Sequence, residues 1–170
     1  MPRPDNRSND EIRPSHFQTN FVPNSDGSVL AVCGNTQVIC TVNISKGVPG
    51  WMKAQNVSGG WLTAEYSMLP GSTHSRNRRE NKSGPGGRSS EIQRLIGRSL
   101  RAIIDLEKVG PFTISIDCDV LNADGGTRCT SINGAYVALR LAVAKLMEEG
   151  SLTESPIKEG IAAISIGILD

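Results

Sequence analysis

Two short segments of the sequence combine glycines, an arginine and the expected start of a helix. Gly86-Gly87-Arg88 precedes the first predicted helix, and Gly125-Gly126-Thr127-Arg128 precedes the second. The first N–H groups of a helix have no partner within it and carry a partial positive charge. Glycines let the backbone come close to a ligand, and an arginine presents a planar fork that matches phosphate oxygens. The two segments therefore predict a phosphate site, provided that the fold brings them together.

The same residues also have a purely structural interpretation, since Gly-Gly before a helix is a common turn. Two segments of one design favour the functional interpretation more than a single segment would, and both interpretations stay open at this point. Neither segment has the G-x-x-x-x-G-K-[ST] spacing of a P-loop, which argues against an ordinary nucleotide triphosphatase.

Two aspartates near the second segment could support a different chemistry. Asp117 and Asp119 are two apart on a predicted strand and so share a face, and Asp124 lies in the loop that follows. Paired carboxylates beside a phosphate site can hold a magnesium ion. The interpretation that we favour is that they accept hydrogen bonds from loop N–H groups or pair with an arginine.

The histidines and cysteines give no sign of nucleophilic or metal chemistry. His16 and His74 are far apart, and neither lies beside a Ser or Cys in a recognisable motif. No C-x-x-C pair is present, so buried reduced thiols are the favoured interpretation of the cysteines. These are Cys33, Cys40, Cys118 and Cys129.

The elements that must position the two glycine-arginine segments follow from residue patterns. β-Rich runs on either side of Gly34-Asn35 predict a hairpin over residues 28–42, and residues 61–69 predict a further strand. Apolar side chains at helical spacing predict a helix through residues 92–104, with Ser90 and Gln93 as a capping box.

The second half of the chain repeats this alternation of strand and helix. Residues 112–120 alternate like a strand, and a second helix should end near Glu149-Gly150. The apolar run from Ile161 to Leu169 predicts a buried strand. The fold class is therefore α/β, a mixed sheet with packed helices, in a single domain over residues 1–170. Because the chain stops at Asp170, directly after that strand, we expect the domain to be incomplete at its C-terminus.

Composition and charge are those of an ordinary globular protein, with 38% hydrophobic and 21% charged residues and a net charge of +1. Basic residues are concentrated between His74 and Arg101, a stretch that suits either a solvated face or an RNA contact. No apolar run reaches the roughly 20 residues of a membrane span, and the polar N-terminus has no signal-peptide core. We therefore expect a cytoplasmic protein without membrane contact.

Several motifs resemble those of the ribonuclease PH family, in the same order along the chain. They are GWLTAEYSMLP at residues 60–70, GRSSEIQRLI at 87–96, DCDV at 117–120 and ADGGTR at 123–128. The opening DEIRP at residues 10–14 is similar as well. The resemblance extends over essentially the whole chain, and its long collinear motifs make it specific.

The resemblance implies a phosphorolytic 3′-to-5′ exoribonuclease. Such an enzyme uses inorganic phosphate to trim tRNA precursors and other RNA 3′ ends, releases nucleoside diphosphates, and acts in reverse as a nucleotidyltransferase. The resemblance also implies a homohexamer, built as a trimer of dimers, and a divalent metal, expected to be Mg²⁺. By resemblance, the phosphate-binding residues are Arg88, Gly126, Thr127 and Arg128. The residues near the RNA path and subunit contacts are Arg76, Arg78 and Arg79.

The chain departs from the family pattern, but not at the phosphate donors. The departures are at Asn6, Gly71, Ser89-Ser90 and Cys129, where Gly, Arg, Thr-Met and Thr are usual. The family's catalytic carboxylates come downstream of Asp170, so no catalytic residue and no metal ligand is assigned in this sequence.

Two rival functions are compatible with the resemblance. Intact glycine-arginine segments argue against a relative that has lost phosphorolysis. The absence of catalytic carboxylates suits a non-catalytic, RNA-binding structural subunit of a ring-shaped RNA-degrading complex. We prefer an incomplete sequence of the enzyme, because the chain stops where the predicted sheet is unfinished.

Overall fold

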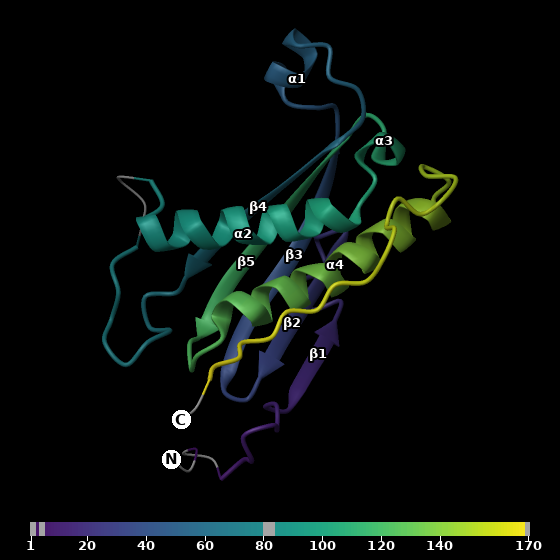
Figure 1. Ribbon diagram of the computed structural model, residues 1–170. Helices are drawn as coiled ribbons and strands as arrows, with labels where there is room; N and C mark the ends of the chain where they lie inside the picture. The colour runs from purple at the N-terminus through teal and green to yellow at the C-terminus, as the bar shows by residue number, and fades with distance from the viewer. Residues whose placement is uncertain (1–2, 4–5, 80–83, 169–170) are drawn as a thin grey trace.

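The computed structural model describes residue 3, residues 6–79 and residues 84–168. Parts of the polar N-terminus (residues 1–2 and 4–5), of the basic stretch (80–83) and of the predicted last strand (Leu169), together with Asp170, lie outside the described residues. Within them, a curved sheet carries two long helices on one face (Figure 1). No helix of the described part is long and apolar enough to cross a membrane.

The sheet has five strands in the order β1-β2-β3-β5-β4. Neighbouring strands pair in antiparallel fashion, except that β4 and β5 pair in parallel. The strands are β1 (Ser15–Thr19), β2 (Gly27–Cys33), β3 (Thr36–Lys46), β4 (Trp61–Met68) and β5 (Phe112–Asn122). The helices are α1 (Gly50–Ala54), α2 (Gly87–Ile103), α3 (Leu106–Val109) and α4 (Thr127–Glu148).

The core lies between the sheet and the helices α2 and α4. Alternate residues of each central strand face the helices and are buried, as the period of two in a strand requires. Gly134 lets α4 come close to β2 and β3, because a Cβ there would lie 2.7 Å from both the Cβ of Ala31 and the Sγ of Cys40. The largest core side chains include Leu62, Ile92, Ile96, Leu100, Ile114, Ile116 and Leu139.

Most of the predicted elements are confirmed. The hairpin turns at Gly34-Asn35, where Gly34 has φ 59° and Cys33 pairs with Thr36. The strands predicted over residues 61–69 and 112–120 are β4 and β5, and the two predicted helices are α2 and α4. The sequence does not predict strand β1 or the short helices α1 and α3, because their few residues show no sustained apolar period.

The predicted capping box is wrong, because α2 begins earlier than its apolar stripe. Its N-cap is Gly86, without a side-chain hydrogen bond, and the N–H of Ser90 already donates to the Gly86 carbonyl within the first turn. The hydroxyl of Ser90 instead donates to the carbonyl of Pro85.

The buried strand predicted over residues 161–169 is also wrong for its described part. Residues 161–168 form no strand, and the exposed fractions of Ile164, Ile166 and Ile168 are 60%, 87% and 97%. The segment runs back along the outer side of α4, on the far side of that helix from the sheet (Figure 1). An apolar run becomes a buried strand only where a sheet edge lies within reach, and α4 separates this run from the sheet.

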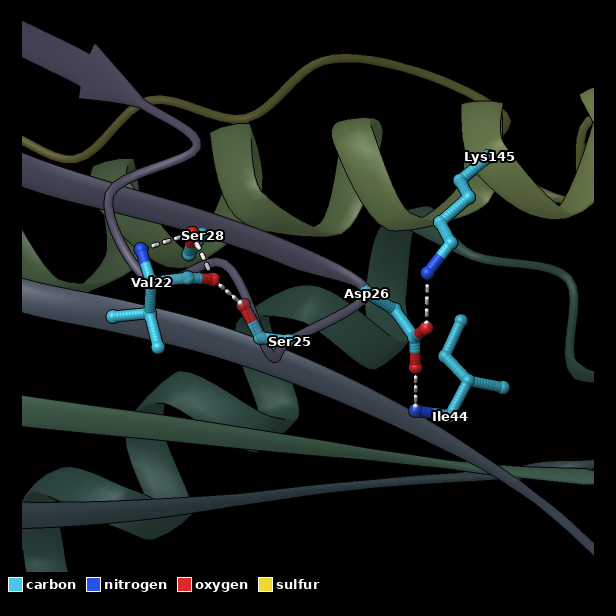
Figure 2. A network of polar contacts seen from close by, with 6 residues as sticks. All are labelled: Val22, Ser25, Asp26, Ser28, Ile44 and Lys145. Carbon is cyan, nitrogen blue, oxygen red and sulfur yellow. Dashed lines mark hydrogen bonds and ion pairs between the residues drawn. The ribbon is translucent and has the colours of Figure 1, made fainter.

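A polar network fixes the C-terminal half of α4 to the loop between β1 and β2 (Figure 2). Lys145 of α4 donates to Asp26 at 2.9 Å, and the same carboxylate accepts the N–H of Ile44 at 2.7 Å. Ser25 and Ser28 both donate to the carbonyl of Val22 and shape the loop. Partial burial opposes the charge on Asp26, but the hydrogen bonds from Lys145 and Ile44 outweigh it and lower the pKa of Asp26.

Asp26→Asn is expected to lower the free energy of unfolding at pH 7 by about 1 kcal/mol, because it removes the ion pair with Lys145. Since the pKa of Asp26 is below its ordinary 3.8 in the folded chain, its contribution is fully present above that value. It is lost as the pH falls through the lower, folded-state pKa. Urea unfolding at pH 7 and at about pH 3 should therefore show a difference that shrinks in acid.

The exposed carboxylate Glu159 provides the matched control for this series. Glu159→Gln should leave stability within about 0.5 kcal/mol of the parent at both pH values. A constant deficit of Asp26→Asn across the pH range would contradict the ionic origin of the effect.

Candidate phosphate site

The two glycine-arginine segments meet at one cavity. The cavity has a volume of about 460 Å³ and is lined by residues of both segments. Both α2 and α4 begin at the same side of the molecule (Figure 1). The lining includes Arg88, Gly125, Gly126, Thr127, Arg128 and Ser165. The convergence that the sequence could not establish is therefore present, and all four predicted phosphate-binding residues belong to it.

The starts of both helices are uncapped by side chains. The N-cap residues are Gly86 for α2 and Gly126 for α4, and neither position has a side-chain capping hydrogen bond. Glycine has no side chain that could accept from the first-turn N–H groups. With no side-chain cap at either N-cap residue, the positive end of each helix dipole faces the cavity without a capping side chain, as an anion site requires.

Two residues that the sequence analysis did not identify, Arg13 and Thr36, bond to the backbone of the loop before α4. The Arg13 guanidinium donates to the carbonyl of Asp124 at 2.5 Å and to that of Gly125 at 3.1 Å. The hydroxyl of Thr36 donates to the Gly125 carbonyl at 2.6 Å and accepts the N–H of Asp124 at 3.0 Å. With both carbonyls turned toward Arg13 and Thr36, Gly126 takes the left-handed conformation from which α4 starts.

The sequence around Arg13 and Thr36 gives little indication that these residues support the site. Arg13 belongs to the DEIRP motif, which resembles the family without indicating a contact. Thr36 is fully buried at the start of β3. Nothing in the neighbouring sequence indicates that it bonds to Asp124 and Gly125, which lie far along the chain.

Thr127 and Arg128 are each oriented by one further residue. The Tyr66 hydroxyl donates to Thr127 Oγ1 at 3.0 Å, which leaves the Thr127 O–H free to turn toward the cavity. Glu91 of α2 accepts from Arg128 Nε at 3.2 Å and from its Nη2 at 2.5 Å. This bidentate pair joins the two helix starts and leaves Nη1 of Arg128 outside the pair.

Charges at the cavity are coupled through Glu91. The hydrogen bond from Arg128 lowers the pKa of Glu91, and the charge of Arg88 lowers it further. The same hydrogen bond raises the pKa of Arg128. Glu91 therefore lies within the fields of both arginines and stays ionised, which reduces the repulsion between them.

Asp117 and Asp119 do not reach this cavity. They line a neighbouring one of about 490 Å³ together with Glu65 of β4 and Arg79. Burial raises the pKa of both aspartates, and the charge of Glu65 raises them further. Neither the predicted hydrogen bonds from loop N–H groups nor an arginine pair is found for them among the described residues, so that interpretation is corrected.

A divalent metal has no ligand set in the part of the chain that the structure describes. No group of three or more His, Cys, Asp or Glu side chains there is arranged to hold a metal ion. His16 lies exposed on β1, and His74 lines a third cavity.

The arginines predicted near the RNA path lie in the loop between β4 and α2, and all three are exposed. Arg79 lines the neighbouring acidic cavity. Thr73 and Asn77 of the same loop line the phosphate-site cavity. The basic loop therefore borders the site, although Arg76 and Arg78 do not line it.

In sequence, the chain is similar to proteins of one family. The model of the 3′ exoribonuclease family, domain 1, matches residues 11–145. Ribonuclease PH of Neisseria meningitidis serogroup C, serotype 2a, is 54% identical over 165 residues, which cover 96% of this chain and 67% of that protein. The serogroup B protein is 53% identical over the same coverage.

Solved structures with the same fold are more distant in sequence. The Archaeoglobus fulgidus exosome with RNA bound to the active site aligns with a TM-score of 0.74 at 22% identity, over 92% of this chain and 62% of that one. Rice Rrp46 aligns with a TM-score of 0.68 at 22% identity, over 82% of this chain and 61% of that one. The chain thus spans about three fifths of the length of these two structures.

Gly126→Ala is expected to destabilise the fold by about 1–2 kcal/mol, because the residue has φ 71° and an added Cβ would lie 2.8 Å from Arg13 Nη2. Gly71→Ala is the control, since a Cβ there meets nothing within 4 Å. Urea unfolding of the two variants measures the difference. Equal stability of the two would show that the left-handed turn at Gly126 is not constrained.

Proposed function

This chain belongs to the ribonuclease PH family, and from that premise we propose that it acts as a phosphorolytic 3′-to-5′ exoribonuclease. An oxygen of inorganic phosphate attacks the phosphorus of the last internucleotide bond. The bond from that phosphorus to the 3′ oxygen of the preceding nucleotide breaks, and the terminal nucleotide leaves as a nucleoside diphosphate. The shortened RNA keeps its 3′ hydroxyl, and the reverse reaction extends it.

One observation carries this proposal: two uncapped helix starts, each with an arginine, line the same cavity. The nucleophile is an anion that must come close to a second anion, the RNA phosphodiester. Arg88, Arg128, Thr127 and the N–H groups at Gly126 offset the charge of the attacking phosphate. Because Tyr66 and Glu91 orient Thr127 and Arg128 before phosphate arrives, little reorganisation of these two donors is needed when it binds.

The proposal includes a divalent metal, Mg²⁺, alongside phosphate as co-substrate. When bound, such an ion would neutralise charge that develops at the scissile group. The described residues provide no ligand set for it, and the role that we propose for Arg88, Thr127 and Arg128 is to bind and orient phosphate.

The proposed substrates are the 3′ ends of tRNA precursors and other RNAs, acted on in the cytoplasm. The likeness of the fold to an exosome structure with RNA bound to the active site supports an RNA substrate. The basic loop with Arg76, Arg78 and Arg79 borders the cavity and offers charge to an RNA backbone. For assembly we propose a homohexamer built as a trimer of dimers, in keeping with family membership.

Arg88→Ala and Arg128→Ala are each expected to raise the phosphate concentration for half-maximal trimming about tenfold or more, because each removes a charge-assisted hydrogen bond to phosphate. Their affinity for RNA should change much less. The assay follows nucleoside diphosphate release from a short RNA as phosphate is titrated. Arg140→Ala, which removes an exposed arginine of α4 outside the cavity, should behave like the parent. Unchanged phosphate dependence in both site variants would refute the assignment.

Replacing Arg76, Arg78 and Arg79 together by Ala is expected to weaken RNA binding at low salt without changing the phosphate requirement. The slope of log affinity against log salt should fall by about 0.7 for each RNA phosphate that the variant no longer neutralises. Fluorescence anisotropy with a labelled single-stranded RNA measures it. The control, with the same change in charge, replaces the exposed Lys46, Lys53 and Lys158. Equal weakening in both triple variants would mean that the loop contributes only net charge.

A further inference from the structure

The segment after α4 runs to the phosphate-site cavity. Ile161 and Ala163 pack against the hydrophobic core, and Ser165 lines the cavity that contains Arg88 and Arg128. Neither the family motifs nor the predicted site includes this serine. Because the sequence predicts a strand here, the position of the segment against α4 is a feature that only the structure reveals.

The pattern of the segment explains why a serine stands at this position. Burial alternates over residues 161–164, and a continuation of that alternation places the exposed Ser165 on the same side as Ile161 and Ala163, in agreement with its place in the cavity lining. Ile161 and Ala163 are half-buried on that face, whereas Ala162 and Ile164 on the other are exposed. The two apolar residues meet the core, and the third, polar residue comes where the core gives way to the cavity.

One side chain of α4 fixes the segment in this register. The amide nitrogen of Asn133 donates to the carbonyl of Ala163 at 3.0 Å, and its amide oxygen accepts the N–H of Ala163 at 2.7 Å. Asn133 thus bonds both backbone groups of one residue, as a neighbouring strand would, and the described part of the segment has no such strand.

The distances along the helix and the segment agree with this arrangement. Asn133 lies six residues after Thr127, which corresponds to roughly 9 Å along the axis of α4. Two extended residues carry the chain roughly 7 Å from Ala163 to Ser165. Because Ser165 lines the same cavity as Thr127, the segment must run toward the helix start.

We propose that Ser165 is a further phosphate-binding residue and that Asn133 is the positioning residue that holds it at the cavity. The hydroxyl of Ser165 donates one hydrogen bond to the bound phosphate, from the side opposite the sheet. Asn133 touches no phosphate and acts only by fixing Ala163, two residues before the serine. This inference rests on the proposed function, since it adds a donor to the same site.

The test is a double-mutant cycle on phosphate affinity, with inorganic phosphate titrated into the full chain by isothermal titration calorimetry. The variants are Ser165→Ala, Asn133→Ala and the two combined, with Arg88→Ala as the reference for the site itself. Ser151→Ala is the control, because this serine is exposed beyond the end of α4. Circular dichroism of each variant checks that the fold is kept.

Ser165→Ala should raise the dissociation constant for phosphate about tenfold, the loss of one hydrogen bond to a charged group. Asn133→Ala should raise it about threefold, and should add nothing further in the Ser165→Ala background. Ser151→Ala should bind phosphate as the parent does.

Two results would overturn the inference, and a third would overturn the proposed function as well. If Arg88→Ala loses affinity while Ser165→Ala binds as the parent, the serine is no ligand and the proposed function stands. If the effect of Asn133→Ala is the same in both backgrounds, Asn133 does not act through Ser165. If Arg88→Ala also binds phosphate as the parent does, the proposed function fails and this inference fails with it.

Discussion

The parallel pairing of β4 with β5 is the constraint on which the site depends. Because the two strands run side by side in one direction, their carboxyl ends lie at the same edge of the sheet. The chain leaves β4 toward α2 and leaves β5 toward α4, so both helices start near that edge. The sheet buries only one face against helices, which brings the two starts together over it. Antiparallel pairing of β4 with β5 would place those two carboxyl ends at opposite edges.

Placing two arginines and two helix dipoles around one cavity has an electrostatic cost that the fold offsets locally. Glu91 pairs with Arg128 in bidentate fashion and lies within the field of Arg88, so the site is not a cluster of uncompensated positive charge. Arg13 is occupied by the carbonyls of residues 124 and 125 and serves as a support. The site thus presents donors to an anion while Glu91 offsets part of its positive charge.

The sequence predicted what depends on neighbours along the chain. The hairpin, the two long helices and the glycine-arginine segments follow from local period and local chemistry, and the structure contains all of them. The sequence did not predict contacts between residues far apart in the chain, such as the contact of Arg13 with Asp124, 111 residues away. The prediction of a strand at residues 161–168 was wrong for the same reason, because a strand needs a neighbouring strand that its own residues cannot indicate. The prediction of a capping box at Ser90 was wrong because α2 begins earlier, with Gly86 as its N-cap residue.

Two neighbouring cavities of similar size differ in the charge of the residues that line them. Met68 lines both, with Glu65, Asp117 and Asp119 on one side and Arg88 and Arg128 on the other. The acidic cavity repels phosphate, and burial together with the mutual repulsion of its carboxylates already raises the pKa of Asp117. Under the proposed function, phosphate is favoured where the helix starts meet, because that cavity is lined by Arg88 and Arg128, whereas the other is lined by three carboxylates and one arginine.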